Sequence, residues 1–331
     1  MDKISKLGGF ALLEDLVWAS LAHESNRCRF STRLCSLLAL EKINLPFLNC
    51  RTTEHGCFVD LAVDRSRWNK ADSLIRDNFD ICTLHLETRS VIASVFPHHR
   101  NPQTAMSLLR LLSRTGIELY AVAQSYSALS VLMSRERLPI FTETMFEHFR
   151  FRSYPTFMDW KSRLTPVPVP REIVASYQEK RPKVYSLEWC EEVDLVMLGS
   201  PMGPMALKIL EDMAEAGASP VFLSGGPSSI HALPVTMTLA SKGAKPLGES
   251  RGEVSCETHP VAVFTMNGPH FGDRYGIAAE LLGALDRHEV EVPNFSCSKA
   301  SITGIVSGDQ VAEAVKAIKG CFDVPSITYM K

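Results

Sequence analysis

The sequence lacks an excess of charge of either sign, and it lacks long hydrophobic runs. Its 35 Lys and Arg residues nearly balance its 37 Asp and Glu residues, which leaves a formal net charge of −2 at pH 7. A strongly basic surface is what holds a phosphate backbone, so we expect no nucleic-acid partner. No stretch approaches the roughly 18 apolar residues that suggest a membrane span. We therefore expect no membrane partner, and the first residues carry no apolar core typical of a secretion signal.

Paired cysteines are also missing. The chain has 9 cysteines, but none form a Cys-x-x-Cys motif, and the odd number leaves one without a partner. This usage is typical of a reducing cytosol, where buried cysteine serves as a small apolar side chain. We expect a cytoplasmic protein with neither disulfides nor structural zinc.

The motifs of common catalytic chemistry are absent as well. There is no Gly-x-x-x-x-Gly-Lys-Ser/Thr phosphate loop, no Gly-x-Ser-x-Gly nucleophile elbow and no His-Glu-x-x-His helix. The run at 98–100 (His-His-Arg) has no Cys or acid nearby at a spacing that would complete a metal site. The residues therefore predict no catalytic residue, no metal and no cofactor, and we expect that the chain is not an enzyme.

What the sequence does contain is one pattern repeated four times. A β-like run is followed by a polar loop, an amphipathic helix and a second β-like run. The helices are expected over about 31–42, 102–115, 204–216 and 274–288, and second helices over 65–78 and 309–321. Pro102 suits a first helical position and Gly116 suits a left-handed stop. Each repeat then reads β-α-β-β-α-β, the order of a ferredoxin-like α+β unit with an antiparallel sheet.

The spacing of the repeats divides the chain into units. We expect four units, and between the second and third a proline-rich linker that cannot be a central strand or a long helix. The expected bounds are 10–80, 81–152, 184–256 and 257–331 for the units and 153–183 for the linker.

Exposed sheet edges are usually covered. We therefore expect units one and two to pair, and units three and four, in two sheets of about eight strands. The two halves of the chain should superpose, and the chain should form a homodimer.

A distinctive order of residues runs through the last repeat. A loop glycine, a Gly-x-Ala helix, a serine turn and an Ala-Val helix ending in Phe are filled by Gly276, Ala278, Ser301, Ala314, Val315 and Phe322. This order resembles the ACT domain, a small regulatory module that binds amino acids, and in particular the last ACT unit of aspartokinases. In the second repeat Gln124 and Ser125 match the family's Gln-Ser-x-Ser stretch. The resemblance implies tandem ACT units like the regulatory region of aspartokinases. Because the first repeat starts by about Leu12, we expect no kinase domain before it.

The glycine-rich loop before the last repeat's helix is the best candidate site. Two glycines and a proline let backbone N–H groups converge at a helix N-terminus, which suits an α-carboxylate. The candidate residues are Asn267, Gly268, Pro269, His270, Phe271, Gly272 and Asp273. They are expected to face the second strand of the third repeat or of a partner chain. Gly199 and Gly203 mark a similar loop, and the resemblance adds Gln124 and Ser125.

Two interpretations of this loop stay open, a ligand site or a simple turn. In the turn, Asp273 caps the helix and Phe271 fills the core. For the whole chain, the resemblance implies a non-catalytic regulatory protein that binds a small-molecule amino acid and is linked to amino-acid metabolism. The alternative is a structural subunit that associates with an amino-acid biosynthetic enzyme and binds no ligand itself.

Overall fold

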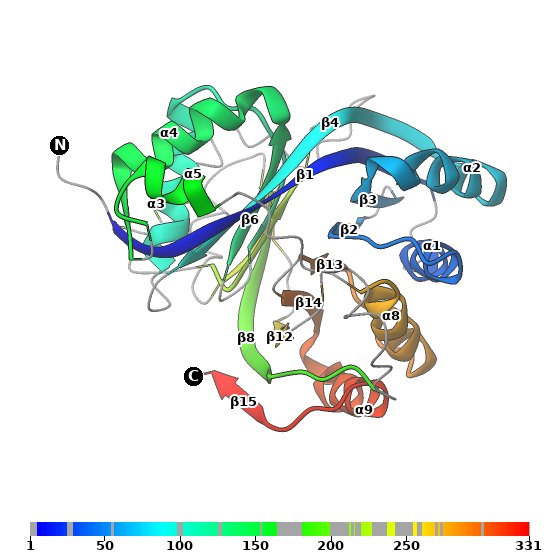
Figure 1. Cartoon of the computed structure of the whole chain (residues 1–331). Coiled ribbons are helices and arrows are strands. Elements are labelled where there is room, and N and C mark those ends of the chain that lie inside the picture. The colour runs from blue at the N-terminus through cyan, green and yellow to red at the C-terminus, as the bar shows by residue number, and fades with distance from the viewer. Residues whose placement is uncertain are drawn as a thin grey trace.

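The computed structural model combines one large, mostly antiparallel sheet with helices in an α+β fold (Figure 1). It describes residues 5–24, 29–53, 56–97, 102–124, 128–152, 154–163, 181–198, 212, 215, 220–226, 237–241, 254–256, 260–268, 271, 274–298 and 301–330. In these ranges no helix is both long enough and apolar enough to cross a membrane.

The first half of the chain holds seven strands and five helices in its described residues. They are β1 (Ser5–His23), α1 (Arg29–Leu40), β2 (Phe47–Thr53), β3 (Gly56–Asp64), α2 (Trp68–Asn78), β4 (Cys82–Pro97), α3 (Pro102–Arg114), β5 (Leu119–Gln124), β6 (Leu129–Ser134), α4 (Leu138–His148), β7 (Phe149–Phe151) and α5 (Phe157–Arg163). Short 3₁₀ turns lead into α2 and α4.

The second half of the chain also contains both strands and helices. Its elements are β8 (Ser186–Leu198), β9 (Phe222–Gly225), β10 (Met237–Ser241), β11 (Val254–Cys256), β12 (Val261–Asn267), α8 (Ile277–Arg287), β13 (Asn294–Cys297), β14 (Ser301–Ser307), α9 (Val311–Cys321) and β15 (Ile327–Met330). The helix predicted over 204–216 lies outside the described residues, apart from positions 212 and 215.

Local sequence sets the ends of α3 and the start of α8. Gly116 follows α3 with a left-handed φ of 68°, and α3 begins at Pro102, as predicted. The start of α8 differs from the prediction, which began this helix at about 274. α8 begins at Ile277, and its N-cap is Gly276 with φ 88°, which only glycine adopts at little cost. Asp273 is therefore not the N-cap of α8, contrary to that part of the prediction.

The first β-α-β-β-α-β stretch has the strand order β4-β1-β3-β2, all antiparallel, as a ferredoxin-like unit requires. Elsewhere an additional strand intervenes. The N-terminal part of β1 lies between β4 and β7, and the N-terminal part of β8 lies between β12 and β15. The last strand of these stretches therefore pairs with the intervening strand, in parallel, and not with its own first strand.

Both intervening strands bend at an acidic residue with left-handed backbone. Asp15 in β1 has φ 58° and Glu192 in β8 has φ 56°. Each lies at a shift of register, in β1 against β4 and in β8 against β12. Bulges of this kind bend a strand, so β1 and β8 each run from one layer of the molecule into the other. The described strands consequently form one 15-stranded sheet, and not the two separate sheets predicted.

The predicted pairing of neighbouring units is wrong. The order β5-β6-β4-β1-β3-β2 places β2 and β5 at opposite edges of the first half, and these two edges do not pair with each other. Each end is completed by the second half instead: β2 pairs with β13, and β5 pairs with β9. We call these two contacts the β2–β13 junction and the β5–β9 junction.

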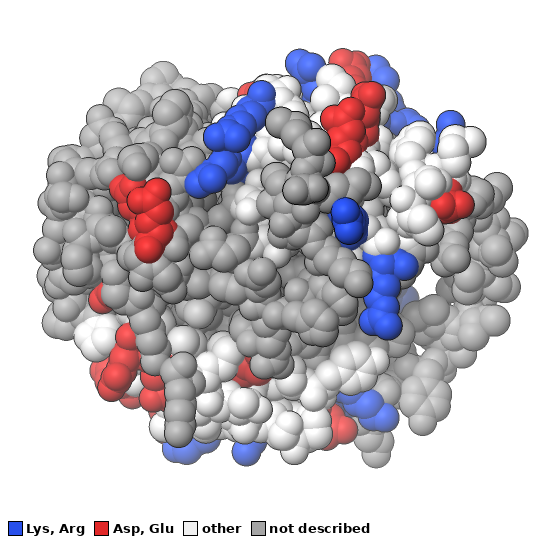
Figure 2. Space-filling model, turned by 90° about the vertical axis from the view of Figure 1, so that its left-hand side faces the viewer, with Lys and Arg blue, Asp and Glu red and all other residues white. Residues whose placement is uncertain are grey.

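Helices cover the outer surfaces of the folded sheet. α1, α2, α8 and α9 lie on one side of the long strands, and α3, α4 and α5 lie on the other (Figure 1). The largest core cluster fills the space beneath the first group and includes the predicted apolar stripe of α8: Ile277, Leu281, Leu282 and Leu285. Basic and acidic side chains on one face form small separate groups of both signs (Figure 2).

Candidate functional site

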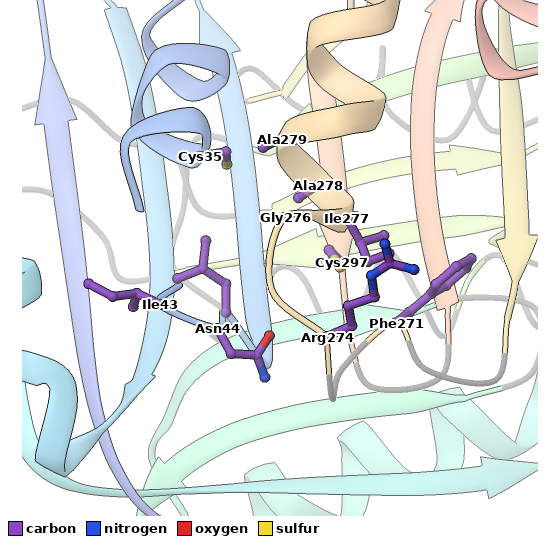
Figure 3. Close-up of a pocket in the computed structure, with 11 residues that line it drawn as sticks. Cys35, Ile43, Asn44, Phe271, Arg274, Gly276, Ile277, Ala278, Ala279 and Cys297 are labelled. Carbon is purple, nitrogen blue, oxygen red and sulfur yellow. The ribbon is translucent and has the colours of Figure 1, made fainter. Parts of the chain in front are cut away.

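A pocket lies at the β2–β13 junction, on the face covered by helices (Figure 3). The first and last stretches of the chain both line it. From the first come Cys35, Ile43, Asn44 and Leu45; from the last come Phe271, Arg274, Gly276, Ile277, Ala278, Ala279 and Cys297. The pocket therefore exists only because β2 and β13 pair and bring α1 beside α8.

The polar part of the pocket is the start of α8. The first N–H groups of a helix have no partner within the helix, and no side chain caps those of α8. This end carries a partial positive charge, so it favours an anion. Arg274 adds a full positive charge just before the helix. Figure 3 shows Arg274 and Asn44 on opposite sides of the space.

The remaining wall is apolar and includes two cysteine side chains. Cys35 on α1 and Cys297 on β13 are both buried and free. Burial raises the pKa of the Cys297 thiol to about 12. Burial, and then the neighbouring Cys297, raise the pKa of Cys35 even further. Both thiols stay protonated at neutral pH, so they act as apolar wall and not as nucleophiles.

The pocket is very small. Its volume is about 10 Å³, which is room for roughly one water molecule. The Phe271 ring is 2% exposed and belongs to the core. In this form the pocket is too small to enclose an amino acid.

The predicted site residues fall into two groups. Pro269, His270, Gly272, Asp273, Gly199, Gly203 and Ser125 lie outside the described residues. Asn267 ends β12 and its amide donates to Ser186 Oγ at 3.1 Å. A Cβ on Gly268 would lie 2.5 Å from the Phe271 ring. Gln124 is buried, and its amide donates to the Pro220 carbonyl at 3.2 Å.

Among the described residues, Phe271 is the only predicted candidate that lines the pocket. Of the described residues just before α8, Phe271 and Arg274 share the pocket with Cys35 and residues 43–45 of the first stretch. Asn44, Arg274 and Cys35 were missed. Arg274 lies next to the predicted loop and could have been included as the cation nearest a helix start. Nothing in the local sequence marks Asn44 or Cys35.

The chemistry of the described residues does not suggest a metal centre. In the ranges that the structure covers, no three His, Cys, Asp or Glu side chains are close enough to hold an ion. The pocket instead offers helix N–H groups, a guanidinium, an amide and an apolar wall. That combination suits a small molecule with one carboxylate and an apolar part.

Comparison with solved structures finds this fold in aspartate kinases. The crystal structure of aspartate kinase from Synechocystis superposes with a TM-score of 0.74 at 14% identity, covering 98% of this chain and 57% of that chain. The ligand-free regulatory subunit of aspartate kinase from Thermus thermophilus covers 43% of this chain and 97% of its own, at 13% identity and a TM-score of 0.38. No family model and no curated protein matches the sequence.

These comparisons correct one expectation and support another. The chain spans little more than half the length of the Synechocystis chain, and at 14% identity the likeness establishes the fold. The expectation that the chain is not an enzyme is contradicted, because the structure matched over 98% of this chain is that of an enzyme. The resemblance to aspartokinases is confirmed at the level of fold.

Proposed function

We propose that this chain is an amino-acid-sensing region of the aspartate-kinase type. It consists of four ACT units at 10–80, 81–152, 184–256 and 257–331, with the linker at 153–183, and it regulates an enzyme of amino-acid metabolism. The observation that carries the proposal is the pocket at the β2–β13 junction, where an uncapped helix start and Arg274 meet an apolar wall. The fold likeness to aspartate kinase supports it.

Each part of the pocket has a role in this proposal. The first N–H groups of α8 and the Arg274 guanidinium hold the α-carboxylate. The amide oxygen of Asn44 accepts a hydrogen bond from the α-ammonium group. The side chain of the amino acid packs against the apolar wall formed by Cys35, Phe271 and Cys297.

The small size of the pocket gives a reason for regulation. With a volume of about 10 Å³, the pocket admits an amino acid only when α1 and α8 separate. A ligand that binds the open form alone shifts the population toward that form. Binding therefore changes the geometry of the β2–β13 junction, and that change is the regulatory signal.

Calorimetric titration with each of the twenty L-amino acids tests the proposal. We expect at least one to bind, and Arg274→Met to weaken its affinity about tenfold to a hundredfold, as for loss of a charged hydrogen bond. Arg287→Met is the matched control, because it removes a charge from the other end of α8; it should leave the affinity within about twofold.

Two results would contradict the proposal. Binding that is unchanged in Arg274→Met would place the site elsewhere. A wild-type protein that binds none of the twenty would favour the alternative, a subunit that associates with a biosynthetic enzyme and binds no amino acid itself.

A further inference from the structure

A row of buried polar side chains crosses the interior face of the sheet, on the side opposite the pocket. Its members are direct cross-strand partners on β1, β3, β2, β13, β14, β12 and β8, in that order. They are Ser20, Asp60, Asn49, Ser296, Thr303, Thr265 and Glu188, none more than 7% exposed. Polar groups are rarely buried in such a line without specific partners, and the partners of one member stand out.

Asn49 lies at the centre of this row, on β2, and it is fully buried. Its amide oxygen accepts a hydrogen bond from Ser296 Oγ on β13 at 2.8 Å. Its amide nitrogen donates to the carbonyl oxygens of Val122 on β5, at 3.0 Å, and Gly225 on β9, at 3.4 Å. The Asn49 side chain therefore contacts both strands of the β5–β9 junction. It also contacts β13, the strand that pairs with β2.

The two carbonyl groups that Asn49 reaches belong to paired residues. Val122 and Gly225 are cross-strand partners at the β5–β9 junction, and Asn49 and Ser296 are cross-strand partners at the β2–β13 junction. The amide therefore joins the two places where the first half of the chain meets the second. Thr303 follows Ser296 in the row, and its side-chain hydroxyl bonds that of Thr265, at 3.4 Å, on the neighbouring strand of the same layer.

We propose that Asn49 couples the two junctions, so that a shift of β2 relative to β13 is passed through its amide to β5 and β9. A buried amide cannot exchange these partners for water, so it keeps them as long as the strands allow. When β2 and β13 move apart, Asn49 either follows β2 and pulls on β5 and β9, or it follows Ser296. In both cases the four strands cannot move independently.

This coupling would carry a signal from the proposed amino-acid site to the other layer. The pocket lies on the outer face of the β2–β13 junction, where Cys297 is the neighbour of Ser296 along the strand. Opening the pocket therefore moves β2 relative to β13, the two strands that Asn49 links through its hydrogen bond with Ser296. Only this use of the coupling by a ligand rests on the proposed function.

Amide hydrogen exchange read by mass spectrometry tests the coupling without any ligand. Ala279→Leu enlarges a half-buried side chain that lines the pocket, and we expect the added bulk to push the β2–β13 junction apart. Exchange is then followed in β5 and β9, in three backgrounds: wild type, Asn49→Leu, and Thr303→Val as the matched control from the same row. Ser296→Ala, which removes one of the three bonds, is the milder variant should Asn49→Leu fail to fold.

In wild type and in Thr303→Val, we expect Ala279→Leu to change exchange in β5 and β9 by about threefold or more, within the usual range for coupled residues. In Asn49→Leu or Ser296→Ala, the change should fall to less than about half of that. An equal response in all backgrounds, or none in wild type, overturns the coupling. Because no amino acid is added, this outcome is independent of the binding titration.

Discussion

Arg51 on β2 and Asp60 on β3 form a buried ion pair whose response to substitution can be worked out from the structure. The Arg51 Nη2 and Asp60 Oδ2 atoms are 2.7 Å apart, and the side chains are 2% and 0% exposed. At an effective dielectric constant of about 20, their attraction is on the order of 6 kcal/mol. Desolvation of two ions costs several kcal/mol each, so the pair as a whole contributes little to stability.

Removing one partner of the pair lowers the stability much more than replacing both partners with apolar residues. We expect Arg51→Met alone to lower the free energy of unfolding by about 3–5 kcal/mol, because Asp60 is left as an uncompensated buried charge. Burial already raises the pKa of Asp60, and the Arg51 charge is the main influence that lowers it. The double variant Arg51→Met/Asp60→Leu should lie within about 1 kcal/mol of wild type or above it.

Urea unfolding measures these differences, if tryptophan fluorescence and circular dichroism give coincident transitions. All four tryptophans are buried, so fluorescence reports on the core. An Arg51→Met variant as stable as wild type would refute the reasoning. It would mean that Asp60 is neutral in the folded protein, and that no ion pair holds the guanidinium.

Two further predictions follow from close contacts and burial. A Cβ on Gly226 would lie 2.6 Å from both Nη atoms of Arg51 and against Asp60, so Gly226→Ala should destabilise the protein by about 1–3 kcal/mol in the same urea assay, as overpacking does. In Arg51→Met the added destabilisation should be smaller. The Cys297 thiol, whose pKa is about 12, should resist iodoacetamide at pH 8 in the folded protein and react in urea; rapid alkylation of the native protein would show that the pocket opens freely.

Much of the local structure is determined by the sequence itself. The apolar stripe of α8 and the glycine that ends α3 act within a few residues, so the pattern alone predicts them, and the structure agrees. The same holds for the order of strands and helices in the first, second and fourth repeats. Of the glycine-rich loop predicted as the site, Phe271 is the only member among the described residues that lines the pocket.

The pairing of distant edges is decided only by the tertiary structure. Ser296 and Asn49 are 247 positions apart, and no local pattern states that β13 will meet β2. That choice depends on which edges remain free once β1 and β8 have bent at Asp15 and Glu192 and entered both layers. The pocket and the Asn49 contacts both lie where those free edges meet. The sequence determines which segments form strands and helices because these preferences are local. The site depends on which strands meet, and that is settled by the packing of the whole sheet.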